Sequence, residues 1–161
     1  MALIKLNNQS YTSGSAFLPS GSVLQVVSTS FSTQFSTSSS SDTDSGLNAS
    51  ITPSSTSNKV LILLTTMLRA QSASNGTTFV YQKIWRGAVG SGTQIHDGYP
   101  IIGVINTTDT RGVGAVTLLD SPNTTSSVTY RVSLNAAYSG TNVYMNQVTD
   151  PSTMTLMEIA G

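Results

Sequence analysis

The chain has 161 residues, enough for one domain that buries about two thirds of the surface its unfolded form exposes. Only 9% of the residues are charged, and seven basic and seven acidic side chains give a formal net charge of zero. No basic patch is present to neutralise phosphates, and no cationic amphipathic segment is present to bind lipid, so neither nucleic acid nor membrane is an expected partner. The absence of cysteine excludes disulfides and thiolate metal sites.

The low net charge and the first residues of the chain bear on where the protein works. A net charge near zero promotes association, so we expect the chain to act within an assembly. Residues 1–8 lack the basic start and long apolar core of a secretory signal. No run approaches the ~18 apolar residues of a membrane-spanning helix. We therefore expect synthesis in a cytoplasm without export by the usual route.

The first twenty residues differ in character from the rest. They begin with a short, mostly apolar patch made of Leu3, Ile4, Lys5 and Leu6. A polar segment containing Gly and Ser follows. We interpret residues 1–20 as an extended arm and residues 21–161 as the main domain. At about 3.3 Å per extended residue the arm reaches tens of ångströms, and its apolar patch would serve as an anchor. The alternative is an edge strand folded back onto its own domain.

From Val23 onward the pattern predicts β-strands. Val23–Val27 is the first, and the hydroxyl-rich segment Phe31–Ser41 is expected to be strand only at its start. Leu47, Ala49 and Ile51 alternate with polar residues, which indicates a half-buried strand. The continuous apolar run Val60–Leu64 favours a central strand covered on both faces. A turn of buried helix has the same pattern, but the flanking turn residues argue against it.

Further strands follow in the second half of the chain. They are expected at Thr78–Arg86, Ile101–Ile105, Gly114–Leu119, Val128–Leu134, Val143–Met145 and Met154–Ile159. Two near-copies of one phrase, Thr52–Val60 and Ser121–Thr129, separate strands, and Asp150–Thr155 echoes them. Proline has no N–H for a sheet, and Ser, Thr and Asn bond to nearby backbone, so each phrase indicates a turn. The whole pattern predicts an all-β, antiparallel, jelly-roll-like β-sandwich of about eight or nine strands.

Few residues are candidates for catalysis. His96 precedes Asp97, but the sequence has no G-x-S-x-G elbow and serine is common throughout, so we interpret His96 as a loop histidine. Asp42 and Asp44 are the only close carboxylate pair and lie in a serine-rich segment. An ordinary surface loop is the favoured interpretation, and a weak cation site with oxygen ligands is the alternative. We predict no catalytic residue, no cofactor and no metal.

Aromatic side chains are the better candidates for binding. Trp85, Tyr99 and Tyr138 could form a surface for a partner or a glycan, because Tyr and Trp are enriched at interfaces. Core or subunit contacts are the alternative for each of them. A sandwich with few charges also leaves sheet edges poorly protected, which favours oligomers with rotational symmetry.

Six phrases, taken in order, carry a family resemblance. They are Leu18–Val27, Leu47–Ile62, Ile84–Gly87, Leu119–Pro122, Thr129–Val132 and Thr155–Gly161. The series resembles a family of tailed-bacteriophage virion proteins, common among marine and cyanobacterial phages, which occur as tail-fibre tips or small stand-alone structural proteins. The resemblance covers residues 18–161. It implies a non-enzymatic, β-rich, trimeric module in the virion, made in the host bacterial cytoplasm.

The N-terminal arm favours one of the two roles that occur within that family. A tail fibre needs an adaptor and a shaft, whereas a short arm with an apolar patch suits a capsid lattice. We therefore expect a capsid decoration (cement) protein, a homotrimer anchored to the major capsid protein. The alternative is the receptor-binding tip of a tail fibre, with a host surface glycan as partner. A glycan-cleaving virion enzyme is a hypothesis of another class, which requires a carboxylate pair in a groove.

Overall fold

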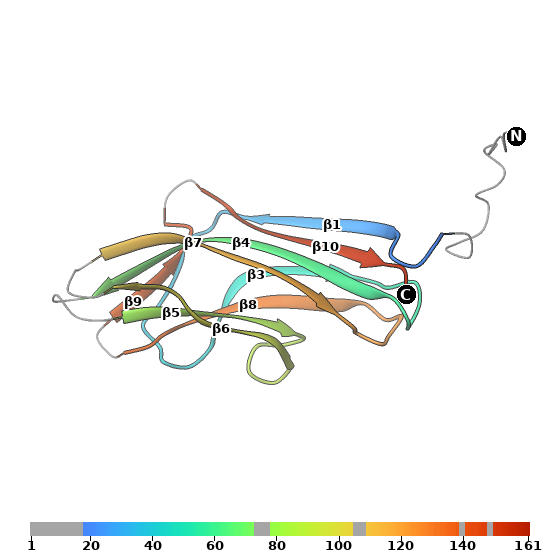
Figure 1. Ribbon diagram of the computed structural model, residues 1–161. Coiled ribbons are helices and arrows are strands. Elements are labelled where there is room, and N and C mark those ends of the chain that lie inside the picture. The colour runs from blue at the N-terminus through green and yellow to red at the C-terminus, as the bar shows by residue number, and fades with distance from the viewer. Residues whose placement is uncertain (1–17, 73–77, 105–108, 139–140, 148–149) are drawn as a thin grey trace, which may run out of the picture.

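The computed structural model describes residues 18–72, 78–104, 109–138, 141–147 and 150–161. Within these ranges the backbone forms ten strands and no helix (Figure 1). The strands are β1 (Val23–Phe31), β2 (Phe35–Thr37), β3 (Thr43–Ile51), β4 (Lys59–Ser72), β5 (Thr78–Arg86), β6 (Thr93–Val104), β7 (Asp109–Asp120), β8 (Val128–Ala136), β9 (Thr141–Met145) and β10 (Ser152–Ile159).

The strands form two antiparallel sheets that pack face to face (Figure 1). In sheet A the order is β1-β10-β4-β9-β2, and β7 also pairs with β4. In sheet B the order is β3-β8-β5-β6. The last strand returns to lie beside the first, and successive strands pass between the layers, which is the Greek-key wrapping of a jelly roll. The predicted fold class is confirmed.

Strand β4 organises sheet A because it is fourteen residues long. On one edge it pairs with β7 from Val60 to Gln71. Strand β10 pairs with the first half of its other edge and β9 with the second half, so β9 and β10 lie end to end. Strands β1 and β2 continue this arrangement by pairing with β10 and β9 respectively.

The junction between β9 and β10 is closed by Asn146, which has a φ of 58°. Its backbone N–H donates to the Met67 carbonyl (3.0 Å) on β4. Its side-chain amide donates to the Phe31 carbonyl (2.6 Å) and accepts the N–H of Ser152 (3.0 Å). One buried side chain thus satisfies backbone groups that the interrupted ladder would leave unpaired.

The core lies between the sheets and is built from alternate positions of the central strands. Leu47, Ala49 and Ile51 of β3 are buried, as their alternation predicts. A polar contact also crosses this core, where the Thr66 hydroxyl of β4 donates to the Gln82 side chain of β5 (2.8 Å). The side-chain nitrogen of Gln82 is buried and has no hydrogen-bond partner among the described residues.

The two proline phrases behave as turns, and each lies beside a carboxylate. The first connects β3 to β4 and surrounds Glu158, as described below. The second follows Asp120 at the end of β7. The Asp120 carboxylate accepts a hydrogen bond from the Tyr130 hydroxyl (2.7 Å) and pairs with Arg86 (3.0 Å). Burial, together with this hydrogen bond, raises the pKa of Tyr130 above its ordinary value.

The structure corrects three details of the sequence interpretation. The Val60–Leu64 run is covered on one face only: Leu61 and Leu63 are half-buried on the outer face of sheet A, because the sandwich has just two layers. His96 is not in a loop, since β6 starts at Thr93 and pairs His96 with Ile84. Asp44 likewise belongs to a strand, β3, rather than to a surface loop.

Candidate interaction face

The outer face of sheet A carries a line of apolar side chains. Val26 on β1 lies opposite Met157 on β10, Met157 opposite Leu61 on β4, and Leu61 opposite Leu119 on β7. These four residues, here called the apolar row, run across four neighbouring strands. Val26 and Leu119 at its two ends are 55% and 52% exposed. Met157 and Leu61 between them are half-buried, so the row is apolar throughout and most exposed at its two ends.

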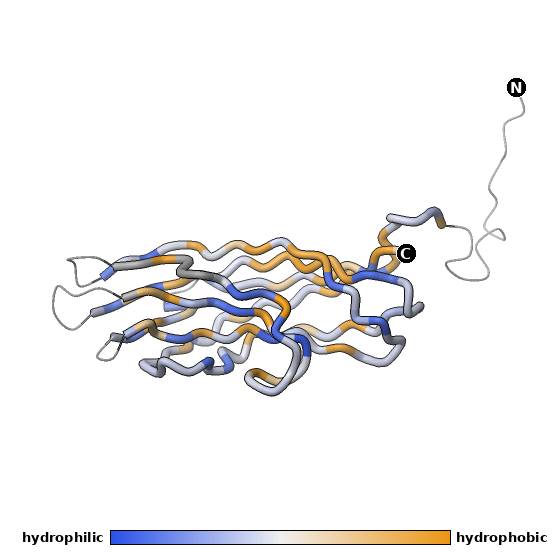
Figure 2. Tube along the Cα trace, turned by 60° about the horizontal axis from the view of Figure 1, so that its bottom comes forward, coloured by the Kyte–Doolittle hydropathy of each residue, from blue (hydrophilic) through white to orange (hydrophobic). Residues whose placement is uncertain are grey.

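The apolar row continues toward the C-terminal end of the sandwich. Val23, which is 51% exposed, lies opposite Ile159 in the same ladder. Hydropathy along the chain shows apolar segments gathering at this end, beside the C-terminus (Figure 2). Contiguous exposed apolar surface of this kind marks protein–protein contact sites, whereas single exposed apolar residues do not.

The same end of the sandwich receives the residues that lead into β1. The Gly21 N–H donates to the Ala160 carbonyl (2.8 Å), and the Ala160 N–H donates to the Ser22 carbonyl (2.9 Å). Gly21 has a φ of 89°, a conformation that glycine adopts without strain. The chain therefore passes the apolar row at residues 18–22, directly before β1.

A buried carboxylate holds this end together beneath the row. Glu158 is 1% exposed and accepts hydrogen bonds from the Asn58 side chain (2.6 Å), the Gln25 side chain (2.6 Å) and the Ser54 N–H (2.6 Å). Burial alone would raise the pKa of Glu158, but these hydrogen bonds outweigh it and hold the pKa below its ordinary value. The network joins β1, β10 and the first proline phrase.

The opposite end of the same face is polar. Arg69 on β4 makes a two-point ion pair with Asp109 (2.8 and 2.7 Å), and its guanidinium lies 5.2 Å from the centre of the Tyr144 ring. Hydrogen bonding to Arg69 lowers the pKa of Asp109, and the nearby charge of Arg111 adds to the effect. One sheet face thus has an apolar end and a charged end.

The residues predicted to bind partners lie in different environments in the structure. Leu3, Ile4, Lys5 and Leu6 lie outside the described residues. Trp85 is 8% exposed, and its indole N–H donates to the Ser133 hydroxyl (2.9 Å), so the indole is packed rather than presented. Tyr99 belongs to β6, but its side chain lies outside the described part of the structure. Tyr138 is 53% exposed and makes a tilted ring contact with Phe79 (6.2 Å).

The carboxylates of the serine-rich segment have cationic partners. Asp42 pairs with Lys83 (3.1 Å) and accepts a hydrogen bond from Asn135 (2.8 Å), whereas Asp44 pairs with Arg131 (3.2 Å). The two carboxylates therefore face separate partners instead of one shared ion. Among the described residues no group of three His, Asp or Glu side chains has a metal-binding arrangement. That part of the chain also contains no helix able to cross a membrane.

Sequence reasoning missed the apolar row. Two features of the sequence indicate it. The run Val60–Leu64 is apolar at every position, although Leu61 does not face the core, and Leu119 at the end of β7 also points outward. Only the strand order brings Val26 and Met157 into line with them.

Comparison with known proteins adds a likeness to virus structures. No family model matches the chain, and no curated protein matches it significantly. The chain is similar to one in the structure of infectious bursal disease virus, Gx strain, with a TM-score of 0.48 and 13% identity over 85% of this chain and 32% of that one. For the VP2 subviral particle of the same virus the TM-score is 0.44, with 12% identity over 100% and 42%. The chain thus spans less than half of the chains it matches.

Proposed function

We propose that this protein is a non-enzymatic structural component of a virus particle, specifically a trimeric decoration (cement) protein on a tailed-phage capsid. The observation that carries the proposal is the apolar row, because a line of apolar side chains across four strands, exposed at both ends, suits permanent contact with another protein. The family resemblance of residues 18–161 points to the same class of particle. The exposed ends of the row, rather than any catalytic group, are the feature to test.

The arm and the apolar row would act together. Residues 18–22 pass the end of sheet A where the row lies, so a preceding arm would start beside that surface. Its patch, Leu3, Ile4, Lys5 and Leu6, would add a strand to the major capsid protein or fill a groove between its subunits. The row would then pack against the same partner or against a neighbouring copy.

The position and copy number of the protein on an imaged particle test this proposal directly. Hundreds of copies on the head are the expected result, and density confined to the tail would contradict it. As a biochemical test, deletion of residues 2–12 should abolish association with particles while the sandwich stays folded. Particles that retain the shortened protein would overturn the anchoring role.

The apolar row needs its own test. Leu119→Lys should weaken association with particles or between copies, measured by co-sedimentation and light scattering. Leu119 is half exposed, so folding stability should change by only about 0.5 kcal/mol. Thr93→Lys, at an exposed position of β6 in sheet B, is the matched control and should have no effect. Equal losses in both variants would show that added charge, not the row, matters.

A receptor-binding fibre tip is the second candidate function. Exposed Tyr138, held against Phe79, is the observation that favours it, since tyrosine suits contact with glycans and proteins. Purified protein that binds host cells and blocks phage adsorption would support this role. A Tyr138→Ala variant that blocks adsorption equally well would remove Tyr138 from it.

A further inference from the structure

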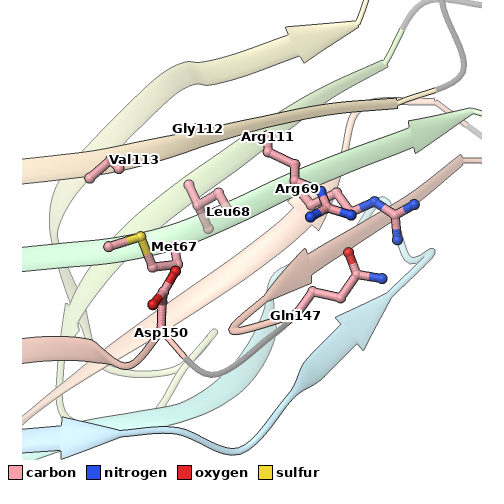
Figure 3. Close-up of a pocket in the computed structure, with 8 residues that line it drawn as sticks. All are labelled: Met67, Leu68, Arg69, Arg111, Gly112, Val113, Gln147 and Asp150. Atoms are coloured by element: carbon pink, nitrogen blue, oxygen red, sulfur yellow. The ribbon is translucent and has the colours of Figure 1, made fainter.

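The charged end of the outer face of sheet A contains a pocket of about 280 Å³. Residues of β4 and β7 line one side of it, and Gln147 and Asp150 lie on the other (Figure 3). It is lined by Met67, Leu68, Arg69, Arg111, Gly112, Val113, Gln147 and Asp150. This volume lies just below the range of about 300–1,000 Å³ usual for ligand pockets, so only a small ligand would fit.

Two arginines occupy one end of this pocket. Arg69 and Arg111 lie directly opposite each other in the β4–β7 ladder, a pairing of like charges that is unfavourable on its own. Asp109 neutralises Arg69 through two hydrogen bonds. Arg111 is exposed and acts on Asp109 through its charge, but it makes no direct hydrogen bond or ion pair to another described residue. An anion bound at Arg111 would relieve the repulsion between the two guanidinium groups.

The rest of the pocket offers acceptors and apolar surface. The Gln147 side chain faces the guanidinium groups (Figure 3), and its buried carbonyl oxygen has no hydrogen-bond donor among the described residues. Asp150 lies beside Met67 at the other end. Between them, Met67 and Val113, opposite each other in the ladder, form an aliphatic wall. A ligand must therefore present an anion, an apolar face and hydrogen-bond donors within one small unit.

We propose that this pocket binds a carboxylated sugar residue. Its carboxylate would pair with Arg111, since guanidinium groups match planar carboxylates in two-point contacts. The C–H face of the ring would lie on Met67 and Val113. Ring hydroxyls would donate to the exposed Asp150 carboxylate, supplying donors that a simple anion lacks. This sugar-binding proposal does not depend on the proposed position of the protein on the virus particle.

The test is an amide-resolved NMR titration of the full chain at constant ionic strength. Sodium glucuronate should cause saturable shifts in β4 and β7 around the pocket, whereas neutral glucose should bind at least about tenfold more weakly, because the charged hydrogen bonds to Arg111 are lost. Arg111→Gln should weaken glucuronate binding about tenfold. Arg131→Gln, an arginine paired with Asp44 in sheet B, should leave it unchanged. Absence of saturable shifts with glucuronate would overturn the proposal.

A second comparison separates a sugar from an acidic peptide. Butyrate carries one carboxylate on a short aliphatic chain, as an acidic side chain does, but no ring hydroxyls. Asp150→Asn should weaken glucuronate binding, because a ring hydroxyl loses its charged acceptor, and should not weaken any butyrate binding. Butyrate binding as tight as glucuronate binding, with no loss of glucuronate affinity in Asp150→Asn, would overturn the sugar and favour an acidic segment of a partner protein.

Discussion

The carboxylate of Glu158 accepts a 2.6 Å hydrogen bond from the side-chain amide of Asn58, which lies one hundred positions earlier in the chain. Asn58 belongs to the first proline phrase, and it also accepts the N–H of Gly161 (3.1 Å). Two phrases that sequence analysis treated separately, a turn and a chain terminus, are therefore parts of one network. That network fixes the end of sheet A on which the apolar row lies.

Glu158→Gln should destabilise the fold by about 1.5–3 kcal/mol, the usual contribution of hydrogen bonds to a charged group. The neutral amide would turn an N–H₂ group toward donors on Gln25, Ser54 or Asn58 and leave at least one of them unsatisfied. Urea denaturation measures the change. Asp150→Asn, at an exposed position, is the control and should be neutral. A neutral Glu158→Gln variant would contradict a structural role for the network.

The contribution of Glu158 should depend on pH. Its folded-state pKa lies below the ordinary 4.5 because the hydrogen bonds favour the carboxylate despite burial. The associated stability is therefore fully present above about pH 4.5 and is lost as the pH falls through the folded-state pKa. The stability difference between wild type and Glu158→Gln should shrink below that pH in denaturation curves. A difference that stays constant down to pH 3 would refute this linkage.

Asn146 should be more sensitive to substitution than Asn123, although both have a positive φ. Either Ala substitution removes the side-chain amide that lets Asn adopt the left-handed region, at a similar cost in both positions. Only Asn146→Ala also leaves the Phe31 carbonyl and the Ser152 N–H without their partner, which adds about 1–3 kcal/mol. Thermal unfolding of both variants makes the comparison. Equal losses of stability would contradict a role for the Asn146 side chain in closing the β9–β10 junction.

Gln82→Met should be neutral or stabilising by about 1 kcal/mol. The change removes a buried amide nitrogen that has no described partner, while Thr66 keeps a second acceptor in the Gly114 carbonyl (3.1 Å). Gly114→Ala should instead destabilise, because its Cβ would lie 2.4 Å from the Gln82 side-chain oxygen. Denaturation of the single and double variants is the measurement. Gly114→Ala should destabilise the Gln82→Met variant as much as it destabilises the wild type, because Met fills a volume similar to that of Gln.

The sequence predicts the fold better than it predicts the site. Alternation at Leu47, Ala49 and Ile51 reports burial of one face directly, since every second side chain points inward. The same rule misleads at Val60–Leu64, where Leu61 is apolar although it lies on the outer face of the sheet. Periodicity shows that a residue is apolar and does not show what covers it.

Long-range relationships were beyond the reach of local patterns. Asn146 is an ordinary polar residue in the sequence, and only the end-to-end placement of β9 and β10 makes it a bridge. Arg69 and Arg111 are 42 positions apart by their numbers and meet because β4 and β7 pair along their whole length. Trp85, the most conspicuous aromatic, is instead packed against Ser133.

The division of β4 between two partner strands lets the β9 and β10 ladders open to different extents along that edge of sheet A. The two ladders share β4 and its pairing with β7, but β2 and β9 can separate without breaking any pair of β10, because those pairs end at Thr65. Amide hydrogen exchange should therefore be faster in β9 than in β10. Contact with a particle through the apolar row would then hold the β10 end fixed, while the β9 end beside the arginine pocket fluctuates more freely.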